Sequence, residues 1–138
     1  MFDNSVDGSI TFADAKLFES EVRALSNMEQ AVALIAIERI LIKERLALAN
    51  GPWLRSPGSG LWEFRIGGSY KAVVSRARLK SIPDVPNFKI LIRVFCSFQS
   101  KNILLISCYD KKRHGGGKKQ DEAIRRARQL RLHYLKDN

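Results

Sequence analysis

The run from Ile92 to Arg128 constrains the fold of this chain more than any other stretch. Its first two segments are apolar and strand-like, and a short polar turn separates them. A basic, glycine-rich loop follows and leads directly into an arginine-rich helical segment. An antiparallel hairpin with a helix packed on it forms a rigid frame, which would hold the loop at one edge. Because clustered cations repel one another, they are retained where they are solvated or where they meet a polyanion.

The positive charge of the chain is concentrated in the part that contains this run. Residues 1–50 hold 5 Lys and Arg against 8 Asp and Glu, a net charge of −3. Residues 51–138 hold 19 against 6, a net charge of +13. A field of that size attracts anions, and nucleic acid is the commonest polyanion for such a surface. A simple role in solubility would give the same composition.

Length and composition predict a single domain, residues 1–138, that is large enough to bury a core. No apolar run is long enough to cross a bilayer, and the acidic N-terminus lacks the basic start of a signal peptide, which predicts a cytoplasmic protein without membrane contacts. Cys96 and Cys108 lie in apolar segments and are expected to be reduced thiols. The two histidines and two cysteines show no short ligand spacing, so neither a metal site nor a cofactor is predicted.

Residues 11–50 have the pattern of two helices, because apolar residues recur there at helical spacing. Thr11 or Asp14 can cap the first helix, and Ser26 with Glu29 has the capping-box spacing that starts the second. The second helix is apolar on more than one face. That pattern predicts either burial between the first helix and the sheet or contact with another protein chain.

From residue 61 the pattern changes to strands and then to a final helix, so that the sheet and last helix span about 61–136. The alternation in Leu61–Ile66 places Glu63 and Arg65 on one face. The sequence therefore predicts an α+β fold in which two N-terminal helices pack on a three- to four-stranded antiparallel sheet with a C-terminal helix. The expected strands are 61–66, 70–79, 88–98 and 103–109, with an optional edge strand at 10–12, a loop at 53–60 and the last helix at about 120–135.

The sequence offers cations and hydroxyls rather than a nucleophile–base–acid triad. Gly115–Gly117 lack the lysine spacing of a nucleotide-binding loop and are expected to be a hinge. Cleavage of RNA by its own 2′-hydroxyl needs a base, cations that stabilise the phosphorane-like transition state, and an acid for the leaving 5′-oxygen. A lysine in a dense positive field gives up its proton more readily, so Lys111 or Lys112 can transfer a proton while Arg65 and Arg93 remain fixed charges. A solvated basic loop would look the same in sequence.

Four blocks of the chain are distinctive as a set: LWEFRI at 61–66, IRVFCSF at 92–98, ILLISCYDKK at 103–112 and QDEAIRRAR at 120–128. In this order they resemble the RelE/ParE superfamily of toxin–antitoxin toxins, in particular its HigB-like, phage-associated branch. The preceding pair of predicted helices fits the same pattern.

The resemblance implies a small α+β toxin that cleaves mRNA on the ribosome, inhibits translation and is silenced by a cognate antitoxin protein in a larger toxin–antitoxin complex. Family sites are basic residues and an aromatic residue on the concave face of the sheet. Carried over by position, the implied catalytic residues are Arg65, Arg93, Tyr109, Lys111 and Lys112, with His114 aligned more loosely. The basic residues expected to hold flanking RNA phosphates are Arg113, Lys118, Lys119, Arg125 and Arg126.

The chain departs from the family pattern at about residues 70–88, which form an insertion. An alternative alignment takes Tyr70–Arg76 as the second sheet motif and moves the role of Arg93 to Lys71. Two other functions also stay open. One is a ParE-like inhibitor of gyrase, against which the basic loop argues, and the other is a non-enzymatic nucleic-acid-binding module such as an inactive toxin homologue.

Overall fold

The computed structural model describes residues 9–113 and 116–137, which form an α+β fold around a five-stranded sheet of order β1-β5-β4-β3-β2. β1 runs parallel to β5, and the other neighbouring strands are antiparallel. The α+β class is confirmed. The prediction of three to four antiparallel strands is wrong, because the sheet has five strands and is mixed, with β1 and β2 as its two edge strands. The strands are β1 (Ile10–Phe12), β2 (Leu54–Gly58), β3 (Leu61–Ser69), β4 (Lys89–Phe98) and β5 (Ile103–Asp110).

β2 replaces the loop predicted at residues 53–60. It is an edge strand that pairs with β3 and turns back through Ser59 and Gly60, whose φ angles are 59° and 80°. Pro57 has no N–H to donate, and an edge strand is the place in a sheet where this loss is tolerated. The proline, glycine and serine that suggested a loop are therefore compatible with an edge strand and its tight turn.

The N-terminal helices begin where their capping residues predict. α1 (Ala15–Arg23) is capped by Asp14, whose carboxylate accepts the Leu17 N–H at 3.1 Å. α2 (Asn27–Ala36) begins with a complete capping box: the Ser26 hydroxyl accepts the Glu29 N–H at 3.2 Å, and the Glu29 carboxylate accepts the Ser26 N–H at 3.1 Å. Both predicted starts are confirmed.

The second helical segment is not one regular helix. After α2 it continues as a π-helical turn η2 (Ile37–Leu41), then α3 (Ile42–Glu44) and a 3-10 turn η3 (Arg45–Asn50). The break falls at Arg45, whose φ of 49° departs from helical geometry and whose guanidinium donates to the Lys101 carbonyl at 2.9 Å. The apolar residues of this segment are mostly buried by the chain's own core, as the first of the two interpretations predicts; these are Val32, Ala33, Ala36, Ile37, Ile40 and Leu41.

The insertion contains a helix where the sequence predicts a strand. α4 spans Tyr70–Arg76, and the Ser69 hydroxyl caps it by accepting the Ala72 N–H at 3.1 Å. The strand prediction relied on a tight turn at Gly67-Gly68, but β3 continues through both glycines. The apolar residues that follow recur at helical spacing and are buried: Tyr70, Val73, Val74 and Ala77. The alternative alignment is therefore wrong, because Lys71 lies exposed on a helix.

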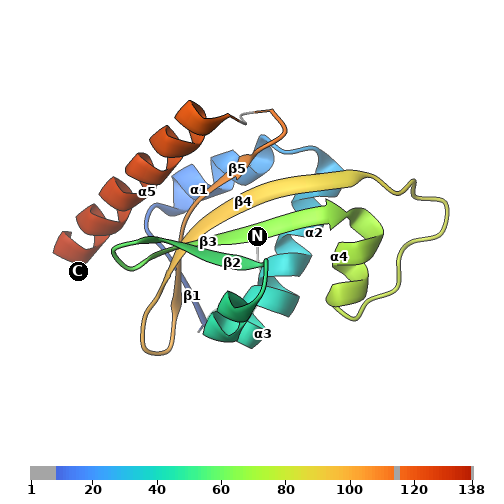
Figure 1. The fold of residues 1–138 in the computed structure, drawn as a ribbon, viewed down its shortest axis with the longest axis horizontal. Coiled ribbons are helices and arrows are strands. Elements are labelled where there is room, and N and C mark those ends of the chain that lie inside the picture. Colours follow the sequence, from blue (N-terminus) through green and yellow to red (C-terminus); the bar gives the residue numbers. More distant parts are fainter. Residues whose placement is uncertain (1–8, 114–115, 138) are drawn as a thin grey trace.

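The helices cover the two faces of the sheet unequally (Figure 1). The main core joins α1, α2, η2 and α4 to one face and includes Phe18 and Phe64. On the other face, α5 (Gly117–Asp137) packs a smaller cluster that includes Phe95 and Ala127. Within the described part of the chain, no helix has both the length and the apolar character needed to span a membrane. Among the described elements, α5 is the one helix that covers the face of the sheet carrying Phe95.

Replacing Phe64 by alanine should remove a fully buried ring from the main core. We expect Phe64→Ala to lower the free energy of unfolding by about 3–5 kcal/mol, measured by urea denaturation. Leu132→Ala is the control. Leu132 lies on α5 and is 61% exposed, so this substitution should change the free energy of unfolding by less than about 0.5 kcal/mol. Similar effects of the two substitutions would contradict this assignment of the core.

Candidate functional site

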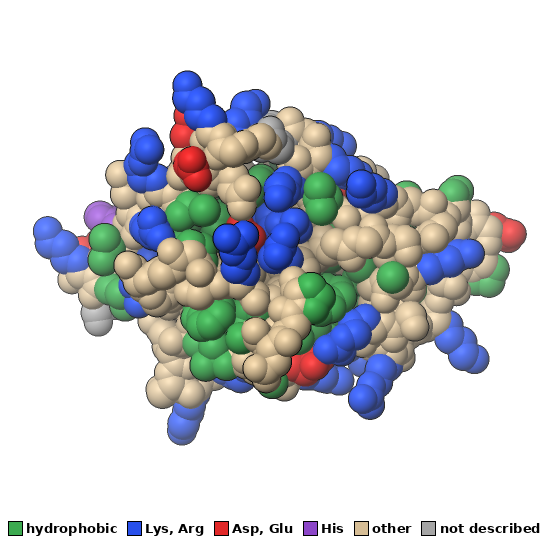
Figure 2. Space-filling model, in the orientation of Figure 1, with side chains coloured by type: hydrophobic (Ala, Val, Ile, Leu, Met, Phe, Trp, Pro, Cys, Tyr) green, Lys and Arg blue, Asp and Glu red, His purple; other side chains and the backbone are tan. Residues whose placement is uncertain are grey.

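The strand register brings together three residues that belong to separate sequence motifs. Arg65 on β3 is the cross-strand partner of Arg93 on β4, and Arg93 is the partner of Tyr109 on β5. Directly opposed residues lie on the same face of a sheet, so these side chains form one row across three strands. The row lies on the face that carries α5, and Figure 2 shows Lys and Arg side chains gathered over the middle strands.

Glu63 lies beside this row, two residues before Arg65 on the same face of β3, and was not among the predicted site residues. Its Oε1 is 3.7 Å from Nε of Arg65 and 3.7 Å from Nε of Arg93. The Glu63 side chain is 2% exposed, that of Arg93 4% and that of Arg65 34%. One buried carboxylate therefore faces two guanidiniums, which leaves an excess of one positive charge. The alternation of LWEFRI already places Glu63 beside Arg65, and an acidic residue at a buried strand position could have revealed it.

Several polar atoms of the row are buried without a hydrogen-bond partner among the described residues. They are Nε of Arg65 and of Arg93, Oε2 of Glu63 and the hydroxyl of Tyr109. The two 3.7 Å contacts are ion pairs that are too long to be hydrogen bonds. Buried donors without partners are costly, and a phosphate supplies several acceptor oxygens for guanidinium groups. A cavity of about 290 Å³ beside the row is lined by both arginines and by Pro52, Trp53 and Gly67.

Burial also sets the protonation behaviour of the row. It lowers the pKa of the Arg93 guanidinium, and the neighbouring charge of Arg65 lowers it further, while Glu63 opposes the change. Burial raises the pKa of Tyr109, and Glu63 adds to this rise. The Tyr109 ring stacks on Phe95 with centroids 5.9 Å apart and 19° between the planes. Tyr109 is therefore a fixed, protonated hydroxyl at neutral pH that can donate a hydrogen bond.

The first loop cation, Lys111, continues the β ladder beyond the end of β5. Its N–H donates to the Leu91 carbonyl at 2.8 Å. The alternation of β5 assigns position 111 to the face of Tyr109 and position 112 to the opposite face. By this alternation Lys111 follows Tyr109 on the same face, two positions along the chain, whereas Lys112 falls on the opposite face.

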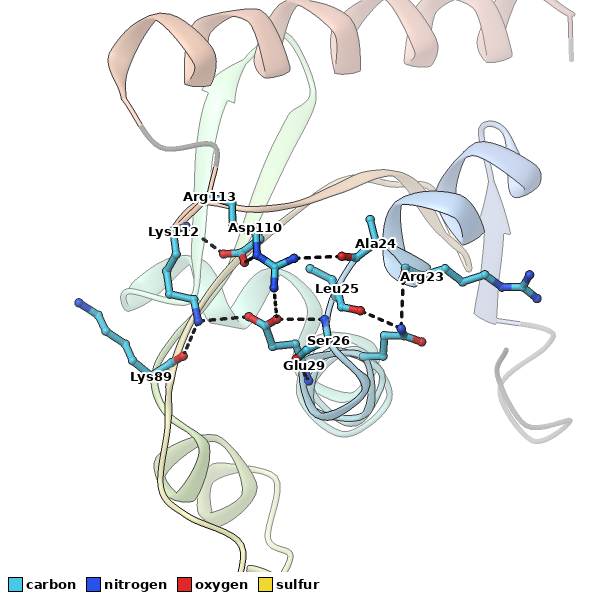
Figure 3. A network of polar contacts seen from close by, with 10 residues as sticks. Arg23, Ala24, Leu25, Ser26, Glu29, Lys89, Asp110, Lys112 and Arg113 are labelled. Carbon is cyan, nitrogen blue, oxygen red and sulfur yellow. Dashed lines mark hydrogen bonds and ion pairs between the residues drawn. The ribbon is translucent and has the colours of Figure 1, made fainter.

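Lys112 and Arg113 converge on Glu29 at the start of α2 (Figure 3). Nζ of Lys112 lies 3.2 Å from Oε2 of Glu29, in the geometry of an ion pair, and donates to the Lys89 carbonyl at 3.0 Å. The Arg113 guanidinium lies 3.7 Å from Oε1 of Glu29 and 3.4 Å from Oδ2 of Asp110, and it donates to the Ala24 carbonyl at 3.1 Å. These two cations tie the end of β5 to the α1–α2 junction, which is a structural role rather than membership of the row.

The other predicted cations lie in different places. Arg126 is 3.7 Å from Glu21, and both line a cavity of about 440 Å³ together with Lys119 and Tyr109. Arg125 lines a separate cavity of about 660 Å³, and Lys118 is exposed at the start of α5. His114 lies outside the described residues. The residues that the structure describes contain no group of three or more His, Cys, Asp and Glu that could hold a metal ion.

Comparisons of the chain with family models, with curated proteins and with solved structures give no match. The two guanidiniums line the cavity of about 290 Å³, the Tyr109 phenol lines the separate cavity of about 440 Å³, and only one carboxylate offsets the charge of the arginines. This arrangement is suited to an oxyanion such as a phosphodiester.

Neutralising Glu29 should loosen the loop that Lys112 and Arg113 hold. Burial disfavours the charged carboxylate, but the hydrogen bonds with Ser26 and the contact with Lys112 outweigh it, so the pKa of Glu29 lies below its usual value. A lowered pKa in the folded state stabilises the protein above the ordinary value of 4.5, and this stabilisation is lost as the pH falls through the lowered pKa. Glu29→Gln keeps an acceptor for the Ser26 N–H and removes the charge.

We expect Glu29→Gln to be less stable than the unaltered protein at pH 7, and the difference to shrink as the pH falls below 4.5. Urea denaturation at pH 7 and pH 3 measures it. Glu38→Gln is the control, since Glu38 makes no ion pair with the described residues. An unchanged difference between the two pH values would show that the charge of Glu29 does not hold the loop.

Proposed function

We propose that this protein is the toxin of a type II toxin–antitoxin system and that it cleaves mRNA without a metal ion, on translating ribosomes. The observation that carries the proposal is the row of Arg65, Arg93 and Tyr109, with buried polar groups that no described residue satisfies. The resemblance of the four sequence blocks to RelE-like toxins supports the same reading. The order of elements supports it in part: α1, α2 and α3 precede β2 and α5 follows β5, but β1 comes before the helices and α4 lies between β3 and β4.

The proposed reaction uses the substrate's own nucleophile. The 2′-hydroxyl of the RNA attacks the neighbouring phosphorus and loses its proton to a base, and the bond to the 5′-oxygen breaks as that oxygen gains a proton. The products are a cyclic phosphate and a free 5′-hydroxyl. Arg65 and Arg93 bind the non-bridging oxygens, where negative charge grows in the transition state. In this proposal Lys111 accepts the proton of the 2′-hydroxyl, and Tyr109 donates a proton to the leaving 5′-oxygen.

The proposal assigns a different task to Lys112. The sequence resemblance implies a phosphate ligand at this position, but the Lys112 ammonium is engaged by Glu29 and by the Lys89 carbonyl. Lys112 and Arg113 therefore act as positioning residues that hold the strand end carrying Tyr109 and Lys111. His114 keeps its place as a candidate by resemblance alone.

The proposed protein partner is a cognate antitoxin. An acidic or amphipathic segment of the antitoxin would cover the face that carries the net positive row and the basic helix α5. The resemblance to RelE-like toxins implies silencing by such a segment. Charge complementarity of this kind favours fast and specific association.

A non-enzymatic RNA-binding module is the second candidate. The observation that favours it is that no described residue forms a hydrogen bond with the Tyr109 hydroxyl, so a complete proton relay is not preassembled. A protein of this type would bind RNA through the same arginines and leave it intact.

Two substitutions test the cleavage directly. We expect Tyr109→Phe to lower the rate of RNA cleavage by about 10²-fold or more, because it removes the proton donor and keeps the ring on Phe95. Arg65→Ala should lower it by about 10²–10³-fold through the loss of a transition-state contact. The control is Tyr70→Phe, which removes a hydroxyl bonded to the Ile82 N–H in the main core.

Induced expression in bacteria, followed by growth curves and by mapping of mRNA ends, measures these effects. The unaltered protein should arrest growth and fragment mRNA, Tyr70→Phe should behave like it, and the two site variants should do neither. Intact mRNA with RNA binding retained would favour the non-enzymatic module. DNA breaks with intact mRNA would favour the gyrase inhibitor, and normal growth with no RNA binding would refute all three.

A further inference from the structure

A cavity lies between α5 and the β2–β3 hairpin. Its volume is about 660 Å³, which is ample for one nucleotide. Its walls combine cations, an amide, two carboxylates and apolar groups, contributed by Arg55, Pro57, Glu63, Gln120, Asp121, Ile124, Arg125 and Arg128.

The arginines of α5 divide into engaged and unengaged side chains. Arg128 donates to the Pro57 carbonyl at 2.7 Å, and Arg131 donates to the Ser59 carbonyl and to the Ser97 hydroxyl, each at 3.0 Å. These two arginines fasten α5 to the β2–β3 turn. Arg125 and, on β2, Arg55 face the cavity without a hydrogen bond or ion pair to any described residue. The cavity therefore keeps two cations that the fold itself does not use.

The cavity adjoins the row through Glu63. Arg55 is the cross-strand partner of Glu63, so both lie on the face of Arg65 and Arg93. Glu63 lines the cavity on one side and faces both guanidiniums of the row on the other. Its Oε2 is buried and has no partner among the described residues, and so is Nε of Arg128. Glu63 and Arg65 are two residues apart on β3, a separation of about 7 Å.

We infer that this cavity is the subsite for the nucleotide adjacent to the phosphate at Arg65 and Arg93, and that it selects the base of that nucleotide. The inference rests on the proposed function, because it takes the ligand of the row to be RNA. Arg55 and Arg125 contact the backbone phosphate of the bound nucleotide. Pro57 and Ile124 contact the face of its base.

The edge of the base meets Gln120 and Asp121 on α5. Both side chains line the cavity and make no hydrogen bond or ion pair with other described residues. A carboxylate only accepts hydrogen bonds at neutral pH, and an amide oxygen accepts them too. The exocyclic amino group of adenine, cytosine or guanine offers two N–H donors to these acceptors, whereas uracil offers one ring N–H between two carbonyl oxygens. The subsite therefore prefers the amino-bearing bases over uracil.

Binding of short single-stranded oligonucleotides tests the subsite without requiring cleavage. The probes are fluorescent tetranucleotides with 2′-deoxy sugars, which lack the nucleophile, and with one variable base at each position in turn. We expect the full-length protein to bind the probes with an amino-bearing base at one position about tenfold more tightly than the uracil probes, measured by fluorescence anisotropy.

Asp121→Ala should remove most of this preference, while Arg125→Ala should weaken all probes alike and reduce the slope of log K against log salt by about 0.7. Lys136→Ala, an exposed cation at the far end of α5, is the matched control and should change neither property. Thermal melting confirms that each variant is folded.

The outcomes separate the two proposals. An unchanged base preference and salt slope in Asp121→Ala and Arg125→Ala, with binding lost in Arg65→Ala, would overturn the subsite and keep the RNA site. A changed preference in a protein that cleaves nothing would support the subsite and refute the cleavage. A protein that binds none of the probes at low salt would overturn both.

Discussion

A single buried carboxylate organises the charged face of this protein. Glu63 faces the guanidiniums of Arg65 and Arg93 on strands that pair only in one register, and the side chains of Glu63 and Arg93 are almost inaccessible to water. The buried guanidinium of Arg93 and the partly exposed one of Arg65 would repel each other more strongly without it. Because the carboxylate offsets only one of the two charges and forms long ion pairs, the row keeps a net positive charge and unpartnered donors. These unpartnered donors and the excess positive charge are the physical basis of the proposed oxyanion site.

A second buried carboxylate does the same for the loop after β5. Glu29 completes the capping box of α2 and receives Lys112 and Arg113, so one residue joins a helix start to a strand end. The consequence reaches the row, since Tyr109 and Lys111 lie just before and within this loop. Lys112 and Arg113 of the basic loop are therefore held by Glu29 and fix the end of β5 against the start of α2.

The same division of labour appears along α5. Arg128 and Arg131 fasten the helix to the β2–β3 turn, Arg126 pairs with Glu21, and Arg125 is left facing a cavity. The hydrogen bonds of Arg128 and Arg131 fasten α5 to the β2–β3 turn, so the earlier turns of the helix are held at a defined distance from the sheet. The cavity of about 660 Å³ between α5 and the β2–β3 hairpin owes its shape to this arrangement.

The sequence by itself determined the α+β class, both N-terminal caps, β4, β5 and the inner face of α5, because each rests on a local period or on a capping residue. It also placed Glu63 beside Arg65. It failed at β2, where proline, glycine and serine suggested a loop, and at α4, where two glycines suggested a hairpin turn; contacts with the rest of the chain decided both outcomes. Only the tertiary structure decided which cations pair with a buried carboxylate and which do not, because a sequence shows that charges are present but not how they pair.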